Sequence, residues 1–435
     1  MTAFATPRVP HPGYRSDEAW ARAQDAADPL ASLRQEFALP RDAGGEPLLY
    51  FCGQSLGLMP TAVPGRVAQE LDDWARLGVE GHMQGRTPWF SYHERVRESG
   101  ARLVGARPDE VVMMNALTVN LQLMLVSFYR PTATRYQVLI EEAAFPSDRY
   151  AVASHLRCRG VDPAEALVVA RPRPGESTLR PEDLEALIAS RGERLALVLF
   201  PGVQYYTGQA FDLARLAAAT HRVGALAGFD LAHAIGNVPL ALHDADADFA
   251  VWCTYKYLNA GPGAVGGCFV HQRHGRDLST PRFAGWWGND PATRFRLHLN
   301  EEFIPQAGAD GWQLSNPAVL SLAPLLVSIE QFDRVGMAAL RAKSERLTGY
   351  LEFLVDRLPP GRIELLTPRD PGARGCQLSL LVREQGRERF AALRARGVVA
   401  DFRQPDVIRL APVPLYNTFH EVWRVGRILE ELLND

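Results

Sequence analysis

The feature that most constrains the fold is an alternation of apolar strands and helices between residues 137 and 252. A strand is expected at 138–142, and the continuous apolar run at 196–200 is typical of a strand that is buried on both faces. Helical segments are expected between such runs, at 147–157 and 213–221. Because strands that alternate with helices form parallel sheets with helices on both faces, we predict an α/β fold with a mostly parallel sheet.

Polar or aromatic side chains follow three of the expected strands. Asp230 ends the strand 225–229, Lys256 follows an apolar segment that ends at Trp252, and Phe145 lies just past the strand 138–142. In open α/β sheets, ligands bind at the carboxyl ends of the strands. We therefore expect these three side chains to meet in one site.

Lys256 stands between β-forming apolar residues and a run rich in glycine and proline. Burial lowers the pKa of an ammonium group, and a neutral amine is the nucleophile that forms a Schiff base with an aldehyde or ketone. A lone lysine in such a run is more often a strand-end residue whose amine reaches solvent. The residues around it favour the chemical interpretation.

Pyridoxal phosphate (PLP) requires a lysine for its aldehyde, an acid at its pyridine nitrogen, a ring that stacks on the pyridine and donors for its phosphate. Lys256, Asp230 and Phe145 match the first three, and Leu117 and Thr118 open a helix whose free N–H groups can bind phosphate. Each has a simpler alternative, because an aspartate can cap the next segment and a phenylalanine can be core. Two further residues are near enough in the sequence to assist: His233 and Tyr255.

The bulk composition indicates a large globular protein and offers no sign of a nucleic-acid-binding or membrane protein. A chain of 435 residues with 47% hydrophobic residues favours two domains, and a net charge of −3 offers no footprint for nucleic acid or an anionic membrane. Five widely spaced cysteines without a C-x-x-C pair predict reduced thiols in the cytoplasm. We expect an N-terminal arm at 1–45 with a helix over 16–37, a large domain at 46–317, and a smaller α+β domain at 318–435.

Several long, irregular motifs resemble those of the kynureninase family. Its members are fold-type I PLP enzymes of the aspartate aminotransferase superfamily. The matching segments span residues 50 to 417 and include YFCGQSLGL at 50–58, NALTVN at 115–120, GVQYYTGQ at 202–209, GFDLAH at 228–233, GWWG at 285–288, LSNP at 314–317 and APVPLYN at 411–417. The resemblance therefore covers nearly the whole chain.

The resemblance implies a set of site residues. Cofactor contacts fall on Leu117, Thr118, Phe145, Pro146, Ser147, Asp148, Asp230, His233, Tyr255 and Lys256, and Trp286 and Asn316 match positions that reach the cofactor from a neighbouring subunit. Substrate contacts match His82, which lies in a glycine-rich loop at 78–89, together with Asn316 and Arg409. A homodimer with shared active sites is implied. Pro201 departs from the pattern, since some relatives have a serine there.

The implied reaction is hydrolysis of L-kynurenine, or its 3-hydroxy relative, to an anthranilate and L-alanine. Lys256 would transfer the Cα proton, and Tyr255 would transfer protons at the γ-carbonyl. Arg409 would bind the α-carboxylate as a bidentate fork. Two alternatives remain open from the residues alone. One is a cysteine desulfurase-like lyase that would use Cys376, and the other is a catalytically dead relative that binds a ligand through the same scaffold. The sequence leaves the choice between the two kynurenines open.

Overall fold

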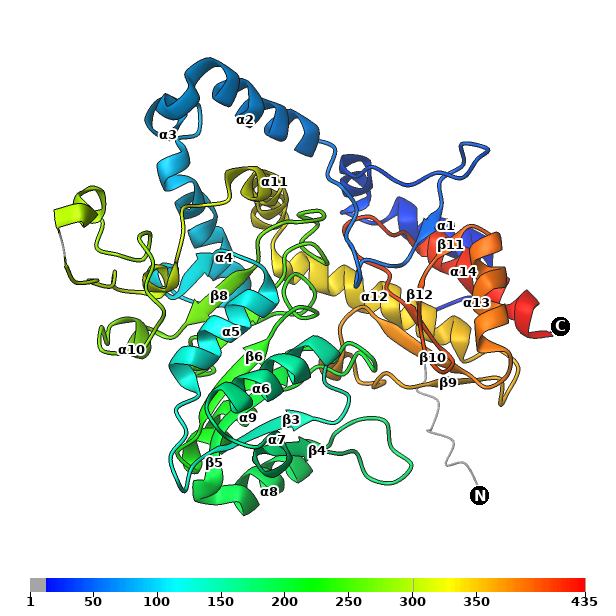
Figure 1. Ribbon diagram of the computed structural model, residues 1–435. Coiled ribbons are helices and arrows are strands. Elements are labelled where there is room, and N and C mark those ends of the chain that lie inside the picture. The colour runs from blue at the N-terminus through cyan, green and yellow to red at the C-terminus, as the bar shows by residue number, and fades with distance from the viewer. Residues whose placement is uncertain (1–12, 300, 435) are drawn as a thin grey trace. The chain divides into compact units, whose positions relative to one another are not determined.

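A computed structural model describes residues 13–299 and 301–434 of the chain (Figure 1). By their contacts these residues form two compact units. The terminal unit contains the described residues up to Leu58, Tyr206–Gln209 and the chain from Ala338 onward, and the sheet unit contains Met59–Tyr205 and Ala210–Met337. The division into arm, large domain and small domain with boundaries at 45 and 317 stays a prediction, and the first twelve residues of the arm lie outside the described ones.

The sheet unit is built on a seven-stranded sheet with the strand order β2-β8-β7-β6-β5-β3-β4. Five neighbouring strands, from β4 to β7, are parallel, whereas β8 runs antiparallel to both β7 and β2. The predicted mostly parallel sheet is confirmed. Its strands are β2 (Val111–Met113), β3 (Gln137–Glu141), β4 (Leu167–Ala170), β5 (Leu195–Pro201), β6 (Leu226–Asp230), β7 (Phe249–Trp252) and β8 (Gly267–Val270).

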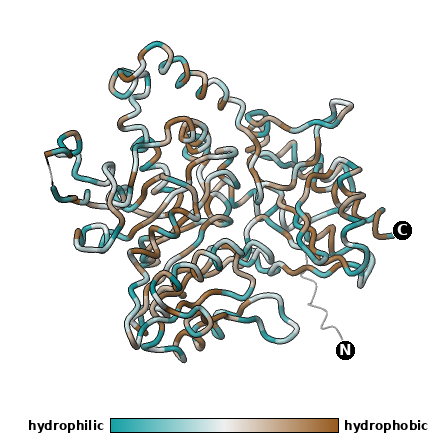
Figure 2. The backbone as a smooth tube through the Cα atoms, in the orientation of Figure 1, coloured by the Kyte–Doolittle hydropathy of each residue, from teal (hydrophilic) through white to brown (hydrophobic). Residues whose placement is uncertain are grey.

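The central strands are apolar on both sides because helices cover them. Every residue of β3 and β7 is buried, and Figure 2 shows hydrophobic colouring along strands in the interior of this unit. Helix α5 packs on β7 and β8, and Phe128 of α5 stacks on Phe249 of β7 with ring centroids 4.9 Å apart. The continuous apolar runs therefore have the double burial that their composition indicates.

The described residues of the sheet unit contain ten α-helices. They are α2 (Val63–Leu77), α3 (Gly81–Gln84), α4 (Arg97–Val104), α5 (Leu117–Phe128), α6 (Pro146–Cys158), α7 (Pro163–Ala166), α8 (Pro181–Arg191), α9 (Leu213–Arg222), α10 (Gln272–Gly275) and α11 (Val319–Val335). None of the helices in the described part of the chain is both long and apolar enough to cross a membrane.

The glycine-rich segment 78–89 was expected to be a loop, but much of it is helical. It forms a 3-10 turn, Gly78–Glu80, followed by α3. Gly81 is buried under the Trp89 ring, where a Cβ would lie 2.5 Å from a ring carbon. Close contact with a tryptophan, rather than a need for loop conformation, accounts for this glycine.

The terminal unit contains a four-stranded antiparallel sheet with the order β12-β13-β10-β9 and a parallel pair, β1 with β11. The strands are β1 (Leu49–Tyr50), β9 (Ile363–Leu365), β10 (Leu378–Val382), β11 (Val398–Val399), β12 (Asp401–Arg403) and β13 (Val407–Leu410). The helices are α1 (Glu18–Ala26), α12 (Met337–Val355, whose first residue belongs to the sheet unit), α13 (Gly386–Ala395) and α14 (Phe419–Asn434).

The described part of the N-terminal arm packs against the last helix of the chain. Instead of one helix over 16–37, it forms α1 and a separate 3-10 helix, Ala31–Glu36. Helix α1 contacts α14, and the Asp25 carboxylate accepts hydrogen bonds from the Phe419 and His420 N–H groups, at 2.6 and 3.0 Å. An acidic residue of the arm therefore caps α14, since the first N–H groups of a helix have no partner within it.

A buried aspartate ties together the amino-terminal side of the sheet. Asp248 immediately precedes β7, is 1% exposed, and accepts hydrogen bonds from the Ala227 N–H at 2.7 Å, His221 Nε2 at 2.8 Å and His274 Nε2 at 2.7 Å. Arg273 Nη2 lies 2.6 Å from the same carboxylate. Burial by itself would raise the pKa of Asp248, but these hydrogen bonds outweigh it and hold the pKa well below its ordinary value.

We predict that Asp248→Asn lowers the free energy of unfolding by about 3 kcal/mol at pH 7, because it removes the charge from a buried network and leaves cationic partners unpaired. Asp246→Asn is the matched control: Asp246 contacts Arg273 but its side chain is 59% exposed, so a loss below about 1 kcal/mol is expected. Urea unfolding measures both.

The contribution of Asp248 to the free energy of unfolding should decrease as the pH falls. An aspartate whose pKa is lowered by folding stabilises the protein at pH values above the pKa of the unfolded state, which is about 3.9. This stabilisation is lost as the pH falls through the pKa of the folded state. The difference between parent and Asp248→Asn should therefore shrink below about pH 4. An equal difference at pH 7 and pH 3 would contradict this assignment.

Candidate active site

The carboxyl ends of the parallel strands open into one pocket in the sheet unit. The space among its side chains measures about 520 Å³, including its solvent-filled mouth. Lys256 and Asp230 both face it, so the two groups share one cavity. Its lining comes from the segments after β3, β5, β6 and β7 and from the starts of α5 and α6: Leu117, Thr118, Glu141, Phe145, Ser147, Asp148, Pro201, Val203, Tyr205, Asp230, Ala232, His233, Tyr255 and Lys256.

Lys256 is held by the tight segment that follows β7. The Asn259 N–H donates to the Lys256 carbonyl at 3.0 Å, and Asn259 has a left-handed backbone, with φ of 55°. The Lys256 Nζ atom lies 3.1 Å from His233 Nε2 and 5.7 Å from the centroid of the Phe145 ring. The amine therefore sits at hydrogen-bond distance from an imidazole and near an aromatic face.

Three carboxyl groups form one wall of this pocket. Asp230 ends β6, Glu141 ends β3 and Asp148 lies in the first turn of α6; they are 7%, 4% and 8% exposed. Burial raises the pKa of Asp148 well above its ordinary value, and the Asp230 charge and a hydrogen bond to Asp230 raise it further. The raised pKa favours the protonated form of Asp148, which can donate a hydrogen bond to Asp230.

The phenol of Tyr255 also stays protonated. Burial raises its pKa above the ordinary value, and the neighbouring Cys253, which hydrogen-bonds to the phenol, raises it further. Burial likewise raises the pKa of Cys253 to about 11. At neutral pH these groups are a phenol and a thiol, so Tyr255 can donate a hydrogen bond from its neutral phenol.

Two helix starts meet at the mouth of the pocket. Neither α5 nor α6 has a side-chain hydrogen bond at its N-cap, so their first N–H groups are free of side-chain caps. Thr118 of α5 and Ser147 of α6 lie side by side, with 2.9 Å between Oγ1 and Oγ. Two hydroxyls beside two helix N-termini form a cradle for a dianionic phosphate.

The residues of the pocket fit PLP. One Asp148 carboxyl oxygen, Oδ1, is buried without a hydrogen-bond partner among the described residues, which leaves it available to a ligand. Lys256 would hold the aldehyde, Asp230 the ring nitrogen and Phe145 a ring face. The cradle of Thr118 and Ser147 would hold the phosphate. Nine of the residues expected from the sequence line this pocket, and Pro146, at the start of α6, is not among its lining residues.

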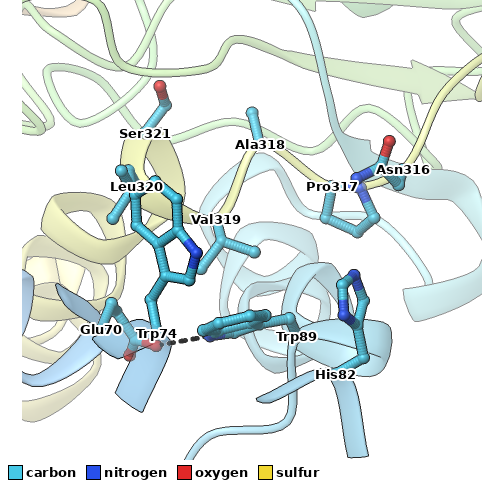
Figure 3. A pocket seen from close by; sticks show the side chains of 10 residues that line it. All are labelled: Glu70, Trp74, His82, Trp89, Asn316, Pro317, Ala318, Val319, Leu320 and Ser321. Atoms are coloured by element: carbon cyan, nitrogen blue, oxygen red, sulfur yellow. Dashed lines mark hydrogen bonds between the residues drawn. The ribbon is translucent and has the colours of Figure 1, made fainter. Parts of the chain in front are cut away.

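His82 and Asn316 lie together in a second pocket of the sheet unit, whose space measures about 740 Å³ including its solvent-filled mouth (Figure 3). The His82 ring packs edge-on against Trp89 at 5.3 Å, and its Nδ1 lies 3.0 Å from the Val79 carbonyl. Trp89 in turn donates through Nε1 to Glu70 at 3.0 Å. The remaining lining is mostly apolar and comes from α2 and the start of α11: Trp74, Pro317, Ala318, Val319, Leu320 and Ser321.

Trp286 and Arg409, which were also expected in the site, line neither pocket. Trp286 is 39% exposed and packs edge-on against Trp287 at 4.8 Å. Arg409 lies on β13 in the terminal unit, is 1% exposed, and contacts Asp401 at 2.7 Å. Arg409 is therefore not a surface residue, and its part in substrate binding stays a prediction.

Sequence reasoning gave no role to two titratable residues of the Lys256 pocket, Glu141 and Tyr205. Glu141 ends a buried strand, as Asp230 does, so the rule that singled out Asp230 could have found it. Tyr205 lies in the GVQYYTGQ motif, and its ring packs edge-on against Phe145 at 5.2 Å. No spacing rule gives that contact, because the two residues follow different strands.

A cluster of Glu110, His243 and His271 at another place in the sheet unit has metal-ligand residue types, but its geometry does not suit a metal ion. The two imidazole rings are stacked, 4.9 Å apart and within 11° of parallel, so their nitrogen lone pairs cannot converge on one ion. The Glu110 carboxylate already accepts from His243 Nδ1 and from the Arg107 and Gln272 N–H groups. The hydrogen bonds of this cluster therefore join the chain segments that carry these residues.

Family models match almost all of the sheet-forming and C-terminal sequence. A model described as aminotransferase class-V matches residues 50–371, and one described as kynureninase C-terminal domain matches residues 340–429. The chain is 55% identical to a kynureninase of Myxococcus xanthus over 96% of this chain and 97% of that protein. It is 57% identical to a kynureninase of Xanthomonas campestris pv. campestris over 94% and 96% of the two chains.

Solved structures show the same fold at lower identity. A C-DES mutant with glycine covalently linked to its PLP cofactor has a TM-score of 0.76 at 17% identity and covers 91% of this chain and 99% of its own. The cysteine desulfurase CsdA from Escherichia coli has a TM-score of 0.75 at 17% identity, covering 93% and 98%. These likenesses concern the fold alone. Cys376, the residue that a desulfurase-like reaction would use, is completely buried in the terminal unit, so that alternative is not favoured.

We predict that the purified protein binds added PLP with a visible absorbance band and that Lys256→Ala lacks this band, because no other lysine lines the pocket. Absorbance titration with PLP measures the effect. Lys343→Ala is a control for the loss of a buried lysine, since Lys343 pairs with Asp28 in the terminal unit, and it should keep the band. A Lys256→Ala protein with the parental band would contradict the assignment.

Proposed function

The chain belongs to the kynureninase family of PLP-dependent hydrolases, and we propose that its Lys256 pocket cleaves the Cβ–Cγ bond of L-kynurenine or its 3-hydroxy relative. The products are an anthranilate and L-alanine. The observation that supports this proposal is the placement of Lys256, Asp230, Phe145 and the Thr118–Ser147 cradle around one cavity. These are the four kinds of group that PLP needs.

Bound PLP supplies an aldehyde that joins covalently to amino groups and a ring that withdraws electrons from the bonds at the substrate Cα. Lys256 would hold the cofactor's aldehyde and would serve as the base for the substrate's Cα proton. His233, with Nε2 at 3.1 Å from Nζ, orients the amine for that transfer. Lys256 thus acts first as the attachment point and then as the base.

Asp230 would keep the ring nitrogen of bound PLP positively charged. Its Oδ1 accepts from the Ala232 N–H at 2.7 Å, which fixes the carboxyl group at the end of β6. Asp148 donates a second hydrogen bond to it. A carboxylate that accepts two hydrogen bonds is preorganised, so it stabilises the adjacent positive charge without rearrangement during the reaction.

Two further residues would interact with the γ-carbonyl and the α-carboxylate of the substrate. Tyr255, whose phenol stays protonated, donates a proton at the γ-carbonyl oxygen as water adds to that carbon. Arg409 binds the α-carboxylate, since a planar guanidinium fork matches a carboxylate better than an ammonium does. The free thiols of all five cysteines are compatible with action in the cytoplasm.

A homodimer with shared active sites accounts for the residues that lie outside the Lys256 pocket. His82 and Asn316 line an apolar pocket of their own, and Trp286 is partly exposed. Around the second pocket, Trp74, Val79 and Met83 are 60%, 76% and 59% exposed, which is unusual for large apolar side chains. We propose that this surface meets a second copy and that Trp286, Asn316 and His82 complete the partner's site.

We predict that the PLP-loaded protein converts kynurenine or 3-hydroxykynurenine to the matching anthranilate, measured by the fluorescence of the product. Asp230→Asn should keep PLP but slow turnover about 100-fold or more, because an amide cannot hold a positive ring nitrogen. Asp212→Asn, a substitution of the exposed N-cap residue of α9, should turn over at the parental rate. Absence of product from both substrates would overturn the proposed function.

We predict that two inactive variants complement each other if active sites are shared. Lys256→Ala and Asn316→Ala chains, mixed 1:1 through unfolding and refolding, should regain about a quarter of parental activity, because half of the dimers are mixed and each has one intact site. Lys256→Ala mixed with Asp230→Ala is the control, since both changes affect the same pocket, and it should regain none. Equal recovery in both mixtures, or a monomer by sedimentation, would refute shared sites.

A further inference from the structure

Glu141 is a buried acid in the Lys256 pocket without a part in the chemistry described above. It is the last residue of β3, lines the pocket and is 4% exposed. Ionising a carboxyl group so deeply buried, without a partner, is strongly unfavourable. Its presence beside a ligand site therefore needs an explanation.

The groups that share the pocket with Glu141 are mostly acidic. Asp148 is contributed by α6 and Asp230 by β6, whereas Lys256 is the only ammonium among the lining residues. Strand β5 and the segment after it contribute uncharged groups, and the titratable remainder consists of His233, Tyr205 and Tyr255. Three ionised carboxylates would face one lysine, which Coulomb repulsion in a buried site does not permit.

The protons on this wall are distributed unequally. Burial raises the pKa of Glu141 to about 8. A hydrogen bond from its own backbone lowers this pKa, and the charge of Asp230 raises it further. Glu141 and Asp230 both raise the pKa of Asp148, whereas Lys256 lowers it. The raised pKa values of Asp148 and Glu141 favour their protonated forms at neutral pH.

We propose that Glu141 is a positioning residue of the cofactor site, a neutral carboxylic acid that keeps the charge of this wall on Asp230 alone. This inference rests on the proposed PLP-dependent function. A second negative charge on the wall would repel the cofactor, whose phosphate gives it a net negative charge. We therefore infer that deprotonation of Glu141 weakens cofactor binding at alkaline pH.

Glu141→Gln tests the inference, because glutamine has the shape of the neutral acid but cannot ionise. PLP affinity is measured by absorbance titration from pH 6.5 to 9. At pH 6.5 the variant should match the parent within about twofold, whereas by pH 9 the parent should bind about threefold or more weakly than the variant. Difference infrared spectra of the PLP-bound proteins should show a carboxylic-acid C=O band that the parent loses near pH 8 and the variant lacks.

Glu142→Gln is the matched control, with the same substitution one residue further along. The Glu142 side chain is 51% exposed and pairs with Arg171, so its variant should keep the parental pH profile. Thermal unfolding checks that each variant is folded. If a variant does not fold, the infrared titration of the parent protein decides by itself. A carboxylic-acid band that persists unchanged through pH 8 overturns the proposal.

The possible outcomes separate this inference from the proposed function. A parent protein that binds no PLP overturns both. A parent that binds PLP and turns over kynurenine, with pH profiles identical in parent and Glu141→Gln, overturns the role of Glu141 alone. A tenfold or larger loss of affinity in Glu141→Gln at pH 6.5 also overturns it, because the negative charge would then be the useful feature.

Discussion

The charge balance around Lys256 is the constraint on which the rest of the site depends. One amine faces three buried carboxyl groups, and the nearest partner of that amine is an imidazole at 3.1 Å. Such a set is stable only where protons neutralise the surplus carboxyls, so the Asp148 proton and its hydrogen bond to Asp230 are structural as well as chemical features. A cofactor with a positive ring nitrogen then finds one carboxylate ready to receive it.

The sheet brings these groups together because its central strands are parallel and tightly paired. Pro201 pairs with Asp230, and Asp230 pairs with Val251, so the ends of β5, β6 and β7 lie level. Gly228 of β6 lies against the Phe249 ring, where a Cβ would come within 2.1 Å of a ring carbon. Close packing at that glycine keeps β6 and β7 adjacent, and hence keeps Asp230 and Lys256 in one cavity.

The two pockets of the sheet unit divide the expected site residues by chemistry. The Lys256 pocket holds the groups that handle protons and charge, whereas the His82 and Asn316 pocket is mostly apolar and is lined by two tryptophans. An apolar, aromatic surface suits the aryl ring of a kynurenine and not its amino-acid end. The proposed sharing of sites between two copies gives this separation a functional reason.

The sequence by itself determined the α/β fold, the strand ends that deliver Lys256 and Asp230, and the helix starts at Leu117 and Ser147, the second of which begins one residue earlier, at Pro146, in the structure. These follow from local patterns: apolar runs, glycine and proline boundaries, and the rule that ligands bind at the carboxyl ends of parallel strands. Roles for His82, Asn316, Trp286 and Arg409 came from the family resemblance, and they remain predictions.

Only the tertiary structure decided which groups touch. It placed His233 against Lys256, joined Asp148 to Asp230, made Glu141 a third acid of the pocket, and packed α1 of the arm on α14. It also made β8 antiparallel and the segment at 78–89 partly helical. Such contacts depend on distances between side chains on different elements, and proton positions depend on those distances in turn, so no pattern within one segment can specify them.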